Sequence, residues 1–278
     1  MPPDHPAAGH RGAPPVPGSR ARRARELVAG ACRDLSGLLV PVACAGCGRP
    51  DVPWCSACDT WWRAPAVRRD HGAGRLDLLD GRTLLPVRAP AAYAGPVRHA
   101  LVAWKDGGRA DLDGHLGAVA RRVGVTLADD VCAAVPATVG RVLVVPVPST
   151  AQARRRRGRE PVAVLAAGLV AGLADGGVDA QVARALHRSG GPDLAGLGAR
   201  ARREALAGRV RVRRRQAVRG RVVLLVDDVL TTGATLAACH AALVAAGARV
   251  LGAGAVAATA PPVARTAPPG VHPGVEAG

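Results

Sequence analysis

The 278-residue sequence contains no phenylalanine, isoleucine or asparagine, and aromatic residues make up only 2% of it. So few aromatic rings leave few platforms on which the bases of a single-stranded nucleic acid could stack. Lysine is nearly absent too, since Lys105 is the only one among 38 basic residues. This skew indicates a genome that favours Ala, Arg, Gly, Pro and Val codons. The net charge of +17 is therefore consistent with compositional drift as well as with a nucleic-acid footprint.

Several motifs that would define an enzyme class or a membrane protein are also missing. No Walker A sequence is present, which argues against an NTPase, and no Gly-x-Ser-x-Gly, which argues against an α/β-hydrolase. The first thirty residues have no apolar core, so no signal peptide is predicted. The longest weakly charged stretch, 234–264, is interrupted by His240, Arg249 and several glycines, so no membrane span is predicted. We therefore expect a cytoplasmic protein, in which cysteines bind metal or stay free rather than form disulfides.

The most informative stretch of the chain is 221–235. Its apolar residues, 222–226, predict a strand buried on both faces, as in the middle of a parallel sheet. Asp227 and Asp228 follow directly, and an alanine-rich helix pattern begins soon afterwards and ends near Gly247. The loop between the acidic pair and the helix pattern is built from hydroxyls and small residues: Thr231, Thr232, Gly233, Ala234 and Thr235.

This arrangement predicts a site for a sugar phosphate. A strand-to-helix loop directs backbone N–H groups into the space above the sheet edge, and the helix N-terminus adds partial positive charge. Gly233 and Ala234 allow an anion to approach the backbone, and the threonine hydroxyls can donate to it. Asp227 and Asp228 would instead accept hydrogen bonds from the vicinal hydroxyls of a ribose. The alternative is a buried strand followed by an acidic helix N-cap, which explains one carboxylate but not two followed by three threonines.

Four of the seven cysteines form two Cys-x-x-Cys pairs close together: Cys44, Cys47, Cys55 and Cys58. Each pair presents two thiolates from one tight turn, for which Gly46 and Gly48 supply backbone freedom, and two pairs complete a tetrahedron around Zn²⁺. Because protein would fill all four positions, the predicted zinc site is structural. Disulfides or a redox motif are the alternatives, but a redox pair would not need a second pair so close. Three nearby tryptophans are expected to form a small core rather than a base-stacking surface: Trp54, Trp61 and Trp62.

Two further segments are candidates for ligand contacts. A helix pattern over 97–104 ends at Lys105, whose survival as the single lysine suggests that arginine will not serve there, unless it escaped substitution by chance. A second buried strand, 141–148, precedes a basic loop, 149–160, which could bind pyrophosphate or could simply be solvated. The contacts expected from this loop come from four residues: Ser149, Thr150, Arg157 and Gly158.

The remaining patterns complete an α/β domain. Helices are predicted over 112–123 and 161–174, strands over 178–186 and 249–257, and a mobile flap over 187–203. Strands that alternate with helices indicate a mostly parallel sheet flanked by helices, with the ligand at its C-terminal edge. The expected organisation has five parts: a disordered leader 1–25, a helix with the zinc module 26–66, an irregular linker 67–90, the α/β domain 91–260 and a proline-rich disordered tail 261–278.

Taken together, these features resemble the ComF family of competence-associated, GntX-like proteins, whose fold is that of type I phosphoribosyltransferases. The resemblance covers about residues 40–258 and rests on the order of the motifs: four cysteines, Tyr-x-Gly, a helix ending in lysine, Val-Pro-Val-Pro with an Arg-Gly loop, and the Asp-Asp-Val and Thr-Thr-Gly-Ala-Thr motif. It implies that 231–235 holds the 5-phosphate of phosphoribosyl pyrophosphate (PRPP), Asp227 and Asp228 its ribose, and 149–158 its pyrophosphate. The sequence departs from the family where relatives read Arg-Gly-Phe-Asn-Gln, and at Leu194 and Ala205.

Two functions follow from the resemblance. One is transfer of the phosphoribosyl group from PRPP to an unknown acceptor, a glycosyltransferase reaction, with Mg²⁺ bridging the pyrophosphate and with Lys105 and Asp228 as candidate catalytic residues. The other is a non-catalytic protein that binds single-stranded DNA, with DNA-uptake and recombination proteins as partners. The sequence shows no nucleobase-recognition segment, so the acceptor stays open.

Overall fold

The computed structural model describes residues 42–71, 73–78, 82–136, 140–189 and 209–260. The predicted leader, the helix expected before the cysteines of the 26–66 part and the predicted tail lie outside the described residues. So do most of the predicted flap, including Leu194, and the position of Ala205.

The domain is built on a seven-stranded, mostly parallel sheet. Its order is β1-β2-β9-β8-β4-β5, and β3 also pairs with β9. Only β1 and β2 are antiparallel to each other. The strands of this sheet are β1 (Val67–Arg68), β2 (Val87–Ala89), β3 (Ala91–Ala92), β4 (Val142–Pro146), β5 (Ala180–Val182), β8 (Val222–Leu230) and β9 (Arg249–Ala258). The central position of β8 between β4 and β9 confirms the prediction of a buried strand in a parallel sheet.

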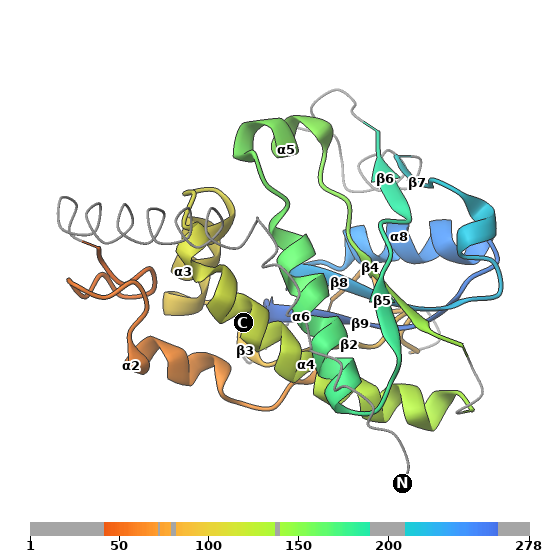
Figure 1. Cartoon of the computed structure of the whole chain (residues 1–278), viewed down its shortest axis with the longest axis horizontal. Coiled ribbons are helices and arrows are strands. Elements are labelled where there is room, and N and C mark those ends of the chain that lie inside the picture. The colour runs from red at the N-terminus through yellow and green to blue at the C-terminus, as the bar shows by residue number, and fades with distance from the viewer. Residues whose placement is uncertain (1–41, 72, 79–81, 137–139, 190–208, 261–278) are drawn as a thin grey trace, which may run out of the picture.

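Helices cover both faces of this sheet, because alternate residues of the central strands enter two different hydrophobic cores. Val142, Val144 and Leu224 pack with α3 (Gly95–Lys105), α4 (Asp113–Ala134) and α6 (Pro161–Asp175). Their neighbours Leu143, Val145 and Leu225 pack with α8 (Ala234–Ala245). Figure 1 shows the sheet between these helices. The predicted α/β fold with a flanked, mostly parallel sheet is confirmed.

Two predicted boundaries are corrected by packing. The helix expected over 112–123 continues to Ala134, because its buried stripe extends through Leu127 and Val131. Within the predicted linker 67–90, β1 and β2 are strands that join the main sheet, and Val87 pairs with Ala253 of β9, so the α/β domain begins before residue 91.

The strand predicted over 178–186 is two strands in two different sheets. β5 pairs with β4, and the Ala183 N–H still donates to the Val144 carbonyl at 2.8 Å. The Ala185 N–H then donates to the Ala183 carbonyl at 2.8 Å, which turns the chain out of the ladder. β6 (Leu186–Arg188) pairs instead with β7 (Val210–Val212) in a two-stranded antiparallel sheet.

The cysteine-bearing segment packs beside α3 and α4 (Figure 1). It contains α2 (Ser56–Asp59) and a short 3-10 turn (Thr60–Trp62). Trp62 is fully buried in the main core, where its Nε1 donates to the Val256 carbonyl at 2.9 Å. Arg109 donates to the Ala43 and Pro53 carbonyls at 3.0 and 3.1 Å. The segment is therefore tied to the α/β domain and also has a small core of its own, formed by Cys44, Cys55 and Cys58 with Val52 and Trp54 packed against them. Trp61, at 55% exposure, lies outside both cores. No described helix combines the length and apolar character that crossing a membrane requires.

Candidate functional site

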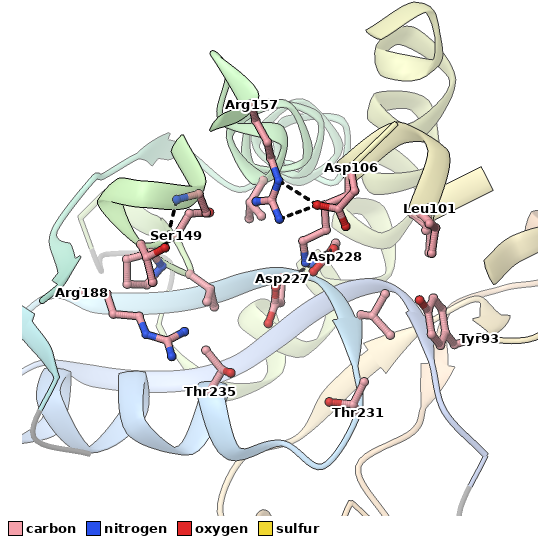
Figure 2. A pocket seen from close by; sticks show the side chains of 18 residues that line it. Tyr93, Leu101, Asp106, Ser149, Arg157, Arg188, Asp227, Asp228, Thr231 and Thr235 are labelled. Atoms are coloured by element: carbon pink, nitrogen blue, oxygen red, sulfur yellow. Dashed lines mark hydrogen bonds and ion pairs between the residues drawn. The ribbon is translucent and has the colours of Figure 1, made fainter. Parts of the chain in front are cut away.

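A cavity of about 470 Å³ opens where β4 and β8 end, the edge at which parallel α/β sheets bind ligands. Figure 2 shows its lining, which comes from the ends of both strands, α3, α5, β6 and the start of α8. The polar lining residues are Tyr93, Lys105, Asp106, Ser149, Thr150, Arg157, Arg188, Asp227, Asp228, Thr231 and Thr235. The cavity thus unites the loop after β8 with the segment after β4, which are about eighty residues apart in the chain.

The loop after β8 adopts a conformation that only glycine accommodates at its centre. Gly233 has a φ of 74° and begins α8 as its N-cap, and a Cβ there would lie 2.5 Å from Leu76 Cγ. Thr231 is exposed and Thr235 half-buried, and both line the cavity. Thr232, Gly233 and Ala234 do not line it, and the Thr232 carbonyl accepts instead from the Arg75 N–H at 3.1 Å.

The acidic pair lies within β8 rather than after it, and one member forms an ion pair. Lys105, the last residue of α3, places Nζ 2.5 Å from Oδ2 of Asp228. Asp228 is almost fully buried, while a third of the Lys105 side chain is exposed. Burial lowers the pKa of Lys105, but the charge of Asp228 outweighs it and the pKa is raised. Lys105 is therefore a fixed positive charge beside the acidic pair.

Asp227 behaves differently from its neighbour. Its Oδ1 accepts from the Asp228 N–H at 2.9 Å, and its side chain lines the cavity. Burial, followed by the negative charge of Asp228, raises the pKa of Asp227 well above its usual value. A carboxylate accepts hydrogen bonds and a protonated carboxyl also donates one, so this pair can bind a polyhydroxyl ligand.

The segment after β4 is a helix and not the predicted basic loop. α5 (Ala151–Arg157) begins at Thr150, whose Oγ1 accepts from the Ala153 N–H at 3.1 Å as an N-cap. Ser149, Thr150 and Arg157 line the cavity, but Gly158 does not, because it ends the helix with a φ of 65°. The run of arginines favoured a loop by charge, yet arginine has a high helix propensity once an N-cap is present.

Two charged residues of the cavity were missed by the sequence analysis. Asp106 follows Lys105 and accepts from Arg157 at 2.9 Å and from Arg156 at 3.0 Å. Arg188 enters from β6, inside the segment that was predicted as a flap. Asp106 could have been predicted from the sequence, because it directly follows Lys105, which was already a candidate for ligand contacts. Nothing local marked Arg188 among so many arginines.

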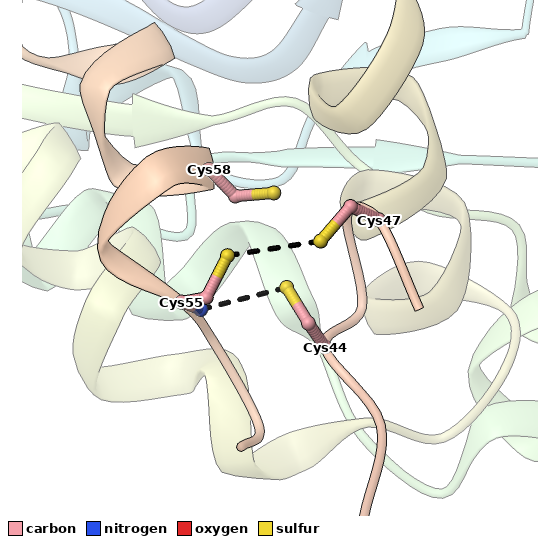
Figure 3. Close-up of side chains that lie close together, drawn as sticks. All are labelled: Cys44, Cys47, Cys55 and Cys58. Atoms are coloured by element: carbon pink, nitrogen blue, oxygen red, sulfur yellow. Dashed lines mark hydrogen bonds between the residues drawn. The ribbon is translucent and has the colours of Figure 1, made fainter. Parts of the chain in front are cut away.

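The four cysteines form the second candidate site (Figure 3). Their sulfur atoms all lie within 4.8 Å of one another, and Cys47 Sγ is 3.7 Å from Cys55 Sγ. A tetrahedral site with Zn–S bonds of about 2.3 Å has sulfur atoms about 3.8 Å apart, so the spacing fits zinc. In the described part of the chain no other group of His, Cys, Asp or Glu side chains is arranged to hold a metal ion.

The backbone around Cys44 favours a thiolate, whereas burial and then the neighbouring cysteine side chains raise the pKa of Cys58 above its usual value. Burial raises the pKa of Cys44, but N–H groups of Cys47, Cys55 and Gly46 outweigh it and lower the pKa to about 6. Gly46 is required by a close approach, since a Cβ there would lie 2.8 Å from Cys58 Sγ. Gly48 supplies the turn, with a φ of 78°. None of the six described cysteines is in a disulfide.

No family model and no curated protein matches the chain. The class that fold and sites define is therefore an α/β protein with a mostly parallel sheet and a four-cysteine cluster near its N-terminus that could hold a metal ion such as zinc.

Proposed function

We propose that this protein is a phosphoribosyltransferase-like protein of the ComF type, which binds PRPP or a related 5-phosphoribosyl ligand and transfers the phosphoribosyl group to an acceptor. The observation that carries the proposal is the shared cavity. Thr231 and Thr235, the acidic pair, and Arg157 line one space although two segments far apart in the chain supply them. Had 231–235 been buried or turned away from 149–157, no single ligand could have joined them.

Each group in the cavity has a role that its chemistry supports. The threonine hydroxyls and the N-terminus of α8 would hold the 5-phosphate. Asp227 and Asp228 would bind the ribose hydroxyls, and the ion pair with Lys105 holds the Asp228 side chain in place. Arg157 would meet the pyrophosphate leaving group, whose developing charge a fixed guanidinium stabilises.

The residues of the cavity fit Mg²⁺ only if it binds together with the ligand. Asp106 and Asp228 are engaged by Arg157 and Lys105, and the cavity carboxylates do not form a metal-binding group among the described residues. Mg²⁺ would therefore be held largely by pyrophosphate oxygens, where it neutralises charge on the leaving group. Zinc in the cysteine cluster would be structural, because all four positions are cysteines and the cluster is outside the cavity.

Isothermal titration calorimetry with PRPP and Mg²⁺ tests the proposal. We expect saturable binding, which Thr231→Val and Thr235→Val each weaken by about tenfold, because each removes one hydroxyl donor to a charged phosphate. Thr126→Val is the matched control, since Thr126 is on α4 outside the cavity and bonds only to the Arg122 carbonyl at 3.4 Å. Absence of PRPP binding by the wild-type protein, or equal binding by all three variants, contradicts the proposal.

Binding of single-stranded DNA without catalysis is the second candidate. Arg155 and Arg156 are exposed on α5, and Trp61 is an exposed aromatic platform on the cysteine segment. If this function holds, affinity for a single-stranded oligonucleotide should fall steeply as salt rises, because arginine–phosphate contacts release counterions. A fluorescence anisotropy titration at several salt concentrations measures the slope. Weak binding that does not change with salt excludes this function.

A further inference from the structure

The cavity contains three basic side chains, and one of them has no counter-charge in the part of the chain that the structure describes. Lys105 is paired with Asp228 and Arg157 with Asp106. Within the described residues no carboxylate pairs with Arg188, and its Nε is buried without a hydrogen-bond partner. The cavity therefore contains one guanidinium whose partner is not supplied by the described chain.

An unpaired guanidinium in such a place is costly. Arginine does not shed its proton in proteins, so burial cannot be relieved by neutralisation. Burial, and then the nearby charge of Arg209, lower the pKa of Arg188 below its usual value, which means that its surroundings disfavour the charge. A buried donor left unsatisfied in a cavity indicates an anion that arrives with a ligand.

The fold directs Arg188 toward the phosphate loop. Side chains two residues apart in a strand share a face, so Arg188 lies on the same side of β6 as Leu186. Leu186 is buried in the core that also contains Leu236 of α8. Figure 2 shows the guanidinium of Arg188 pointing into the cavity beside Thr235, in the first turn of α8.

We propose that Arg188 binds the 5-phosphate of the ligand, closing a clamp of which Thr235 and the N-terminus of α8 form the other side. The identity of this anion rests on the proposed function. The loop 231–235 contains no basic residue. A phosphate monoester carries about 1.5 to 2 negative charges, whereas a helix N-terminus offers only about half a positive charge. Arg188 adds a full charge in a planar fork that matches phosphate oxygens.

This assignment separates two anion sites in one cavity. Arg188 serves the phosphate at α8, and Arg157, bound to Asp106 at the end of α3, serves the pyrophosphate. Ribose 5-phosphate and Mg²⁺-pyrophosphate therefore probe the two sites separately.

Titration of the full chain with each probe tests the proposal. Arg188→Gln is expected to weaken ribose 5-phosphate at least about tenfold and to change pyrophosphate affinity by less than about twofold. Arg157→Gln is expected to do the reverse. Arg211→Gln is the matched control, because Arg211 is on β7, the strand that pairs with β6, is exposed and does not line the cavity.

Thermal unfolding without ligand adds a second measurement. Arg188→Gln should be at least as stable as wild type, because it removes an unpaired charge. Arg188→Lys, which keeps the charge without the fork, should bind ribose 5-phosphate with intermediate affinity. If Arg188→Gln weakens the binding of both probes equally, or weakens the binding of neither, Arg188 does not bind the 5-phosphate. Such a result would leave the proposed function itself standing. A wild-type protein that binds neither probe overturns the proposed function as well.

Discussion

Replacing Cys55 with serine is expected to remove bound zinc and to destabilise the folded protein by about 3 kcal/mol or more. Structural zinc binding contributes about 10–16 kcal/mol of apparent free energy in small zinc modules, and much of it is folding free energy. In this chain the loss of folding free energy should be smaller, because the hydrogen bonds of Trp62 and Arg109 still hold the segment on the α/β domain. Zinc content by atomic emission and the free energy of unfolding in urea measure the two effects.

The matched control for this experiment is Cys132→Ser. Cys132 is an exposed cysteine near the end of α4 and is outside the cluster. The Cys132→Ser protein should retain one zinc ion per chain and the stability of the wild type. A Cys55→Ser protein that keeps its zinc, or a wild-type protein that contains none after expression in zinc-supplemented medium, contradicts a zinc site. Full stability after zinc loss would contradict only its structural role.

Local sequence patterns were sufficient to predict those features that depend on neighbouring residues alone. The apolar run 222–226 predicted a central strand because only a parallel sheet covered on both faces buries such a run. The cysteine spacing predicted the cluster because two such pairs place four sulfur atoms together. Gly247 predicted the end of α8, and its φ of 84° shows why glycine is there.

The sequence did not predict features that depend on partners distant in the chain. β2 is only three residues long, and it is a strand because the edge of β9 accepts it. The Lys105–Asp228 contact joins residues more than a hundred positions apart, so their adjacency appears only in the folded chain. Arg188 is one arginine among many until β6 places it in the cavity. Charge alone misassigned α5, because a capped helix and a solvated loop can carry the same arginines.

Replacing Asp227 with asparagine is expected to stabilise the free protein at neutral pH while it weakens PRPP binding by about ten- to a hundredfold. The raised pKa of Asp227 means that the folded state binds more protons than the unfolded state. Stability due to this group is therefore lost as pH rises from the unfolded pKa, about 3.9, through the higher folded pKa. Asparagine removes that loss, and a gain of about 1–2 kcal/mol is typical when a strained binding site is relaxed.

Asp70→Asn provides the opposite case. Burial raises the pKa of Asp70, but the Arg68 guanidinium and the Val87 N–H outweigh it and lower the pKa below its usual value. Asp70 therefore contributes stability above the unfolded pKa, and this stability is lost as pH falls through the lower folded pKa. Its asparagine variant should be less stable than wild type at neutral pH, and the two should converge in acid.

Urea unfolding of the three proteins between about pH 2 and pH 8 measures these slopes directly, because the Asp70 contribution is lost only below its unfolded pKa of about 3.9. PRPP titration at neutral pH measures the loss of binding. The stability difference between Asp227→Asn and wild type should grow with pH, because it follows ionisation of the wild-type carboxyl beside Asp228. A difference that is constant across this range would show that Asp227 is not strained by its neighbour. Wild-type PRPP affinity in Asp227→Asn would show that the acidic pair does not hold the ribose, since one of its two carboxylates would then be dispensable.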